Sequence, residues 1–253
     1  MAMKHEFAMY VAHLSSYLSP KRDYIELQDP DAVHRIRSVL RLAQDDELIL
    51  FDGVQQVVCT ITDMNKKTVL VRILSNNRTV SLDPSVTFLL PLLKKEALER
   101  MIYACVELGA NTIQLVITEK SQRSWRSEKE LQRMQAIMVA AAEQSKQFAI
   151  PEMYPPCSLP EALQHHTKHD IKLVADPAGT PLYQVLTQVV QNMHAHKKSS
   201  LVITMGPEGD FTETERELLR TASYQAVRLT PTVLRSQQAG ALLLGTLRSI
   251  ISE

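Results

Sequence analysis

Apolar runs of strand length alternate with helical segments through the C-terminal part of this 253-residue chain. Strands are expected at 86–90, 113–117, 171–175, 201–205 and 226–229. Helices are expected at 95–108, 128–147, 182–194 and 236–251, and a capping box of Thr212 and Glu215 opens one more. A regular alternation of strand and helix predicts a mostly parallel sheet with helices on both faces. The expected fold class of this part of the chain is therefore α/β.

The N-terminal part has the pattern of short antiparallel strands joined by tight turns. Asp52 and Gly53 separate two apolar runs, 47–51 and 54–61, and an Asp-Gly pair in this position is a strong β-hairpin signal. A third β run, 68–74, follows a polar turn. Several short strands of this kind predict a small β-barrel.

A short helix and a linker complete the N-terminal part. Asp29 followed by proline is a favoured helix start, and we expect this helix to continue through Arg41. The polar stretch 76–84 contains Asn, Ser, Asp and Pro and has the composition of a linker. We therefore expect two domains, 1–76 and 77–253.

The charge balance and the cysteines limit the classes of function. Lysine and arginine total 28 and so do aspartate and glutamate, which excludes a wholly basic nucleic-acid coat but not a local basic face. No apolar run in the sequence approaches the ~18 residues that a membrane helix needs, so no membrane partner is expected. The three cysteines are far apart and fit no metal spacing, which indicates reduced thiols in a cytoplasmic protein without a metal site.

Two loops of the C-terminal part are candidates for a ligand site, because ligands of open parallel sheets bind at the carboxyl ends of the strands. The first loop, 205–211, lies between a strand and a helix, and Gly206 and Gly209 let its backbone approach a ligand closely. The helix that follows offers free N–H groups. A plain strand-to-helix turn explains this loop equally well.

The second loop, 230–238, also joins an expected strand to an expected helix. It places Arg235 at the carboxyl edge of the sheet, where a cation can hold an anion or the carbonyl of a base. On spacing alone, a surface salt bridge explains Arg235 equally well.

Two groups of cations are candidates for contacts with RNA. His34, Arg37 and Arg41 share a stripe of the expected N-terminal helix, although such a stripe is more often simply solvated. Arg123 and Arg126 flank the single tryptophan on a loop, a combination that suits an RNA backbone and a stacked base. An ordinary exposed loop is the slightly commoner explanation. The eight histidines show no ligand spacing, and solvated residues are expected.

An ordered set of short motifs resembles the RsmE family. Gly206-Pro207-Glu208-Gly209, followed further along by Val233-Leu234-Arg235, is similar to the C-terminal signature of that family. Further agreeing motifs are Val39-Leu40-Arg41-Leu42, Leu50-Phe51-Asp52-Gly53, Glu107-Leu108-Gly109 and Glu143-Gln144-Ser145 with Pro151. Each motif is weak alone, but the set agrees in order and spacing nearly end to end.

The resemblance implies a fold and a cofactor. It implies an N-terminal PUA-like β-barrel and a C-terminal SPOUT domain, an α/β fold whose last strands and helix form a deep trefoil knot. It also implies that S-adenosyl-L-methionine binds on the two loops. The implied cofactor contacts are Met205, Gly206, Pro207, Glu208, Gly209, Leu229, Thr230, Val233 and Leu234.

The implied activity is the methylation of N3 of a uridine in small-subunit (16S) ribosomal RNA. SPOUT enzymes usually act as homodimers, and the implied substrate is ribosomal RNA within an assembled or assembling ribosomal particle. Arg235 is expected to hold the uracil carbonyls or a flanking phosphate and to favour the anion that forms when N3 loses its proton. Glu208 is the nearest charged candidate for a base, but a role in shaping the cofactor loop fits it better.

The chain departs from the family pattern in the second loop. Thr230 stands where a glycine is usual, Thr232 where an arginine is usual, and Gln237 where a glutamate is usual. Two further cations of the family are replaced by Ala104 and Gln147. These changes leave two alternatives open: a degenerate SPOUT protein that binds RNA or ribosome precursors without methylating, or an enzyme that methylates a different base.

Overall fold

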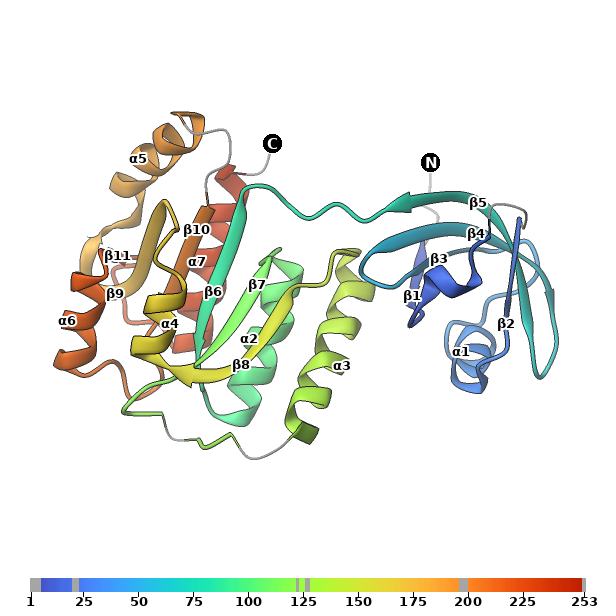
Figure 1. Ribbon diagram of the computed structural model, residues 1–253, viewed down its shortest axis with the longest axis horizontal. Coiled ribbons are helices and arrows are strands. Elements are labelled where there is room, and N and C mark those ends of the chain that lie inside the picture. The colour runs from blue at the N-terminus through green and yellow to red at the C-terminus, as the bar shows by residue number, and fades with distance from the viewer. Residues whose placement is uncertain (1–5, 20–22, 122, 126–127, 196–199, 252–253) are drawn as a thin grey trace. The chain divides into compact units, whose positions relative to one another are not determined.

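The computed structural model of the chain describes residues 6–19, 23–121, 123–125, 128–195 and 200–251 (Figure 1). It contains two compact units. The first comprises Met1–Val80 with Ala142–Ala149, and the second comprises Ser81–Ala141 with Ile150–Glu253. None of the described helices combines the length and the apolar character needed to cross a membrane.

The first unit is built on a five-stranded sheet with the strand order β1-β3-β4-β5-β2. Its strands are β1 (Phe7–Tyr10), β2 (Tyr24–Leu27), β3 (Glu47–Phe51), β4 (Gln55–Met64) and β5 (Val69–Arg78). β1 pairs with β3 in parallel, and the remaining neighbours are antiparallel. The β3–β4 hairpin is confirmed, with Gly53 at φ 92° in its turn.

Alternate residues of these strands form the core of the first unit. Leu48 and Leu50 of β3 and Val57, Cys59 and Ile61 of β4 are almost completely buried. Successive strand side chains point to opposite faces, so this period of two places one face of each strand in the core. Two strands were missed in the sequence, β1 and β2, because runs of four residues are too short to show that period.

The expected helix of the first unit is present, but its regular part is shorter than predicted. Asp29 caps α1 (Pro30–His34) by accepting a hydrogen bond from the backbone N–H of Asp31. The chain then continues as a π-helical turn, η2 (Arg35–Val39), in which the N–H of Leu40 donates to the carbonyl of Arg35. The prediction of a regular helix through Arg41 is therefore wrong beyond His34. A π turn shifts the register of the side chains that follow it.

Residues 142–149 complete the first unit through polar and aromatic contacts. The Glu143 carboxylate accepts hydrogen bonds from the Arg35 guanidinium and, at 2.8 Å, from the backbone N–H of Tyr10. The Phe148 ring packs on that of Phe51, with 4.8 Å between the centroids. Because the Glu143 side chain is only 8% exposed, its charge depends on these donors.

The second unit is a six-stranded sheet with the order β11-β9-β10-β6-β7-β8, in which neighbouring strands pair in parallel. Its strands are β6 (Ser85–Pro91), β7 (Thr112–Ile117), β8 (Glu152–Ser158), β9 (Ile171–Pro181), β10 (Ser200–Met205) and β11 (Gln225–Arg228). Its helices are α2 (Lys95–Glu107), α3 (Glu128–Ser145), α4 (Leu159–His165), α5 (Leu182–Ala195), α6 (Glu213–Thr221) and α7 (Ser236–Ile251). The predicted parallel α/β architecture is therefore confirmed.

Helices cover both faces of this sheet. α7 packs against α2 and α5, whereas α4 packs against α6. The crossovers that contain α4 and α6 run across the sheet in the direction opposite to those that contain α2 and α5. Since crossovers of parallel strands are right-handed, the two groups of helices lie on opposite faces.

Three features of the chain differ from expectation. β8 and α4 were not predicted, and β8 lies at the edge of the sheet, where its two prolines are tolerated. β9 continues beyond 175 to Pro181, but its pairing with β11 shifts from Ala226 opposite Val174 to Val227 opposite Thr180. Residues 175–179 are thus looped out of the β9–β11 ladder, although Ala175 still pairs with Met205 of β10. The expected linker is wrong at 76–78, because β5 extends to Arg78.

Candidate cofactor site

A cavity of about 280 Å³ opens at the carboxyl ends of β10 and β11 and beside residues 175–177 of β9. This volume lies just below the usual range for small-molecule sites, about 300–1,000 Å³. Its walls are the looped-out segment of β9, the loop after β10 and the loop between β11 and α7. The two loops predicted to hold a ligand therefore line one cavity.

Most of the residues predicted to bind the cofactor line this cavity. Those in its walls are Met205, Gly206, Pro207, Glu208, Leu229, Thr230, Val233 and Leu234. Gly209 lies beside it, where an added Cβ would be 3.0 Å from the Cβ of Lys120. The predicted catalytic residue, Arg235, also lines the cavity.

Two positions of the loop after β10, Gly206 and Asp210, restrict which residue types the loop can contain. A Cβ on Gly206 would lie 2.6 Å from Oδ1 of Asp210, so a larger residue there would displace the Asp210 carboxylate. Asp210 has a φ of 60°, a left-handed conformation that aspartate tolerates better than most residues. Its Oδ1 accepts a hydrogen bond from the N–H of Phe211 at 2.8 Å, which fixes the end of the loop.

Two glutamates connect this loop to neighbouring strand ends. The Glu208 carboxylate accepts a hydrogen bond at 3.0 Å from the backbone N–H of Lys94, the N-cap of α2. Glu215, which is only 3% exposed, accepts bonds from the N–H groups of Thr212 and of Glu119, the latter in the loop after β7. The predicted capping box of Thr212 and Glu215 is confirmed, and it also anchors a second loop.

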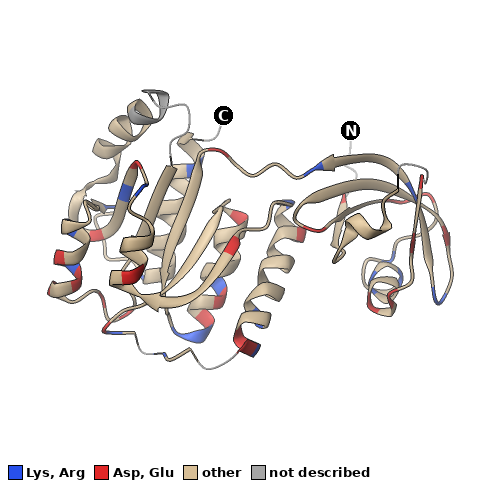
Figure 2. Cartoon of the chain, viewed as in Figure 1, with Lys and Arg blue, Asp and Glu red and all other residues tan. Residues whose placement is uncertain are grey.

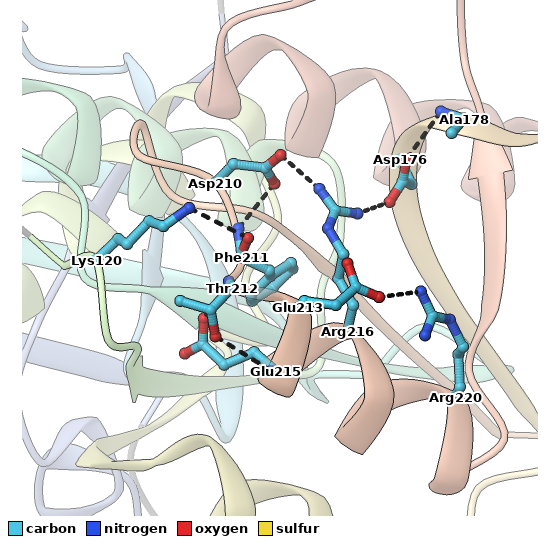
Figure 3. A network of polar contacts seen from close by, with 10 residues as sticks. All are labelled: Lys120, Asp176, Ala178, Asp210, Phe211, Thr212, Glu213, Glu215, Arg216 and Arg220. Carbon is cyan, nitrogen blue, oxygen red and sulfur yellow. Dashed lines mark hydrogen bonds and ion pairs between the residues drawn. The ribbon is translucent and has the colours of Figure 1, made fainter.

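A third connection runs through Arg216 of α6. Its guanidinium donates to the carboxylate of Asp176 in the looped-out segment of β9 and to that of Asp210 in the loop after β10 (Figure 3). Both carboxylates line the cavity. Neither Asp176 nor Arg216 was predicted as a site residue, because the contact depends on the register shift between β9 and β11.

The loop between β11 and α7 presents cations to the cavity. Arg235 is exposed, and its guanidinium forms no ion pair with any of the described residues. The alternative explanation of Arg235 as part of a surface salt bridge therefore has no partner among those residues. Arg228, the last residue of β11, also lines the cavity and was missed. The hydroxyl of Thr230 donates to the carbonyl of Thr232 at 2.6 Å, so this side chain is held within its own loop.

The candidate RNA-binding residues fall into separate places. His34 and Arg37 line a hollow of the first unit together with Lys66 and Lys67, which were missed in the sequence. Arg41 is exposed but does not line this hollow. A polar turn with two adjacent lysines was the signal that could have found the missing pair.

The second group of candidate RNA contacts lies in the loop after β7. The Arg123 side chain is 15% exposed and forms an ion pair with Glu130 at 3.0 Å. Its charge is therefore already partly balanced within the protein. Arg126 lies outside the described residues.

A parallel α/β unit with a ligand cavity at its carboxyl edge, joined to a small β-sheet unit, defines the class of two-part α/β proteins with a small-molecule site. Residues 81–248 match the family model of the RNA methyltransferase domain, and residues 27–74 match that of the RNA methyltransferase PUA domain. The chain therefore belongs to the RNA methyltransferase family.

Named relatives cover nearly the whole chain. It is 28% identical to the ribosomal RNA small subunit methyltransferase E of Mycobacterium bovis, over 92% of this chain and 89% of that protein. The protein of the same name from Synechocystis is 27% identical over 87% of this chain and 71% of its own length. The resemblance to the RsmE family drawn from the sequence is confirmed.

Solved structures give the same result. A methyltransferase E from Neisseria gonorrhoeae, bound to S-adenosyl methionine, is 26% identical with a TM-score of 0.80, covering 97% of this chain and 98% of its own. A methyltransferase from Legionella pneumophila, in complex with the same cofactor, has the same identity, coverage and TM-score.

Proposed function

We propose that this protein uses S-adenosyl-L-methionine to methylate N3 of a uridine in small-subunit (16S) ribosomal RNA. The observation that carries the proposal is the meeting of two loops distant in sequence, around Gly206 and around Leu234, in the walls of one cavity. The relatives named above carry the name of a small-subunit ribosomal RNA methyltransferase, and two similar structures hold this cofactor.

The residues of the cavity fit the cofactor chemically. Gly206, which lacks a side chain and lines the cavity, allows close approach of the backbone to a ligand. Leu229, Val233 and Leu234 offer apolar surface for an adenine ring, and the carboxylate of Asp176 offers acceptors for hydroxyl or ammonium groups. When bound, S-adenosyl-L-methionine supplies an electrophilic methyl group.

Arg235 is the residue that we assign to the target base. Its exposed guanidinium at the rim of the cavity is free to donate to the uracil carbonyls or to a flanking phosphate. N3 of uridine must lose a proton before it attacks a methyl group, and a fixed positive charge stabilises the resulting anion. The protein otherwise contributes by holding the base in line with the methyl group.

The first unit is proposed to bind the RNA backbone. Its family model is that of an RNA methyltransferase PUA domain, and His34, Arg37, Lys66 and Lys67 surround one hollow. Clustered cations of this kind bind phosphates without reading sequence. We also propose that Arg41, Arg123 and Arg126 contribute to RNA binding.

Several finer features complete the proposal. We propose that the first unit closes into a PUA-like β-barrel and that the last strands and α7 form a deep trefoil knot of the SPOUT type. We further propose a homodimer that acts on an assembled or assembling ribosomal particle, and a cytoplasmic location. The boundary expected between 76 and 77 falls within β5, and the first compact unit continues to Val80. The parallel order β9-β10-β6 and the joint cavity of the two loops support a SPOUT arrangement.

Mass spectrometry of ribosomal RNA from a deletion strain tests the function. Loss of a single N3-methyluridine from small-subunit RNA is expected. Loss of another methylated base would favour the alternative target, and an unchanged RNA that accompanies tight RNA binding would favour the non-catalytic alternative. Calorimetry with S-adenosyl-L-methionine separates the last two, since a protein that only binds RNA need not retain the cofactor.

A further inference from the structure

We propose that Arg216 is a positioning residue that sets the affinity for the cofactor by holding two walls of the cavity together. This inference rests on the proposed binding of S-adenosyl-L-methionine. Arg216 does not line the cavity, whereas its partners Asp176 and Asp210 both do. It would therefore act through these two carboxylates and not by touching the cofactor.

Each of the two carboxylates divides its oxygens between its own loop and Arg216. Oδ1 of Asp176 accepts a hydrogen bond from the N–H of Ala178 at 2.8 Å, and its Oδ2 faces the guanidinium. Oδ1 of Asp210 accepts a bond from the N–H of Phe211 at 2.8 Å, and its Oδ2 faces the other arm of the same guanidinium (Figure 3). The Arg216 guanidinium thus joins two loops. In each loop, the carboxylate that binds Arg216 also accepts a backbone hydrogen bond that shapes the loop.

The wall formed by β9 has fewer other fixed points than the loop after β10, which Glu208 already ties to the N–H of Lys94. Residues 175–179 leave the β9–β11 ladder, so regular strand pairing does not hold Asp176 in place. Asp210 lies in a left-handed conformation at the end of its loop. A wall that can move widens the set of cavity shapes, and the cofactor must then select the competent one, which lowers its apparent affinity.

Arg216 itself is well anchored. Its backbone N–H donates to the carbonyl of Thr212 at 2.9 Å in the first turn of α6. The buried Glu215 beside it caps this turn and also binds the N–H of Glu119. The Arg216 side chain is 23% exposed, so its two ion pairs are partly shielded from water. A planar guanidinium can bind two carboxylates with separate arms, whereas a lysine ammonium is a single point of charge.

The next turn of the same helix provides a matched control. Arg220 also binds two carboxylates, those of Glu213 and Glu217, but both belong to α6 itself. Its side chain is 57% exposed. Both signs of charge are visible along α6 in Figure 2. Arg216→Gln and Arg220→Gln therefore remove the same charge from the same helix, but only the first disconnects the cavity walls.

Calorimetry with S-adenosyl-L-methionine on the full chain tests the proposal. Arg216→Gln is expected to raise the Kd for the cofactor by about tenfold. Arg216→Lys should recover part of this loss, and Arg220→Gln should bind like the wild type. In methyl transfer to ribosomal RNA, Arg216→Gln should raise KM for the cofactor while kcat at saturating cofactor changes little. A purely structural role would instead lower the Tm of the ligand-free protein with an unchanged Kd.

A double-mutant cycle covers the case in which Arg216→Gln does not fold. Asp210→Asn keeps an acceptor for the N–H of Phe211 but weakens the bond to Arg216. If the connection acts as proposed, Asp210→Asn alone raises Kd, and adding Arg216→Lys raises it little further. Additive losses, or an Arg216→Gln variant that binds as well as Arg220→Gln, would overturn the proposal. A wild-type protein that fails to bind the cofactor would refute the proposed function instead.

Discussion

The carboxylate of Glu208 accepts a hydrogen bond from the backbone N–H of Lys94, 114 residues earlier in the chain. This contact ties the loop after β10 to the N-cap of α2, at the end of the neighbouring strand β6. Glu208 is also the residue of this loop that the sequence offered as a candidate general base. The Glu208 carboxylate therefore has two candidate roles, which are to hold the loop in shape and to accept a proton from the substrate.

Substitutions of Glu208 distinguish these roles. Glu208→Gln keeps an oxygen that can accept from Lys94, so we expect cofactor affinity and methylation rate within about threefold of the wild type. Glu208→Ala removes the acceptor and should weaken cofactor binding. Calorimetry and a methyl-transfer assay measure both quantities. Inactivity of Glu208→Gln with normal cofactor binding would identify Glu208 as a general base.

Arg235→Ala tests the assignment of this residue to the target base. Removing a charge that stabilises the transition state typically costs about 10²–10³ in rate, and we expect a loss of this size in ribosomal RNA methylation. Cofactor binding should survive. Arg100→Ala, which removes a cation that is 73% exposed on α2, is the control. Unchanged methylation by Arg235→Ala would remove Arg235 from the active site.

The hollow of the first unit predicts a salt-dependent interaction with RNA. Lys66→Ala combined with Lys67→Ala should weaken RNA binding and reduce the slope of log affinity against log salt by about 0.7–0.9 for each phosphate that the protein no longer binds. Titrations at several salt concentrations measure this slope. Arg72→Ala removes an exposed cation of β5 outside the hollow and should leave the slope unchanged. Equal effects of the two substitutions would contradict a localised RNA-binding surface.

Glu143→Ala should destabilise the first unit. The substitution leaves the Arg35 guanidinium and the N–H of Tyr10 without their acceptor, and we expect a loss of about 2 kcal/mol in the free energy of opening. Hydrogen exchange of the β1 and β3 amides measures it. Glu6→Ala breaks an ion pair with Lys146 whose side chains are 62% and 40% exposed, and should cost less than about 0.5 kcal/mol.

The lowered pKa of His169 predicts that the folded protein loses stability in acid. Burial lowers the pKa of His169 from 6.5 to about 4, and His166, with its ring nitrogen at 3.3 Å, adds to this effect. Because the pKa is lower in the folded than in the unfolded chain, protons favour the unfolded chain. The contribution is complete above about pH 6.5 and is lost as the pH falls towards about 4. Between pH 7.5 and 5, the Tm of the wild type should fall more steeply than that of His169→Gln.

Much of the second unit follows from periodic patterns in its sequence. The five expected strands and the helices after them rest on apolar runs that are long enough to show their period. α4 was missed although Ser158 and Glu161 form a capping box. The two prolines of β8 hide its strand pattern, so no expected strand preceded this helix. The helix after Asp29 changes to a π turn at Arg35–Val39, and no local pattern in the sequence indicates this change.

Part of the candidate site could likewise be predicted from the sequence, and part of it could not. The loops around Gly206 and Leu234 were predicted, because their residue types and their places after strands are readable in the sequence. Asp176 and Arg216 were not predicted as partners, because their meeting depends on the register with which β11 joins β9. Asp176-Pro177 within a strand was the available signal, since this pair interrupts regular β structure.

The re-entry point of the segment 175–179 is fixed by close packing. A Cβ on Gly179 would lie 2.5 Å from the backbone carbon of Ala226, so the chain returns to the sheet at a glycine. Pairing on both sides of the segment is complete without it. Insertions or deletions between these two anchors would alter the depth of the cavity while the sheet keeps its order, so the size of the bound molecule can diverge independently of the scaffold.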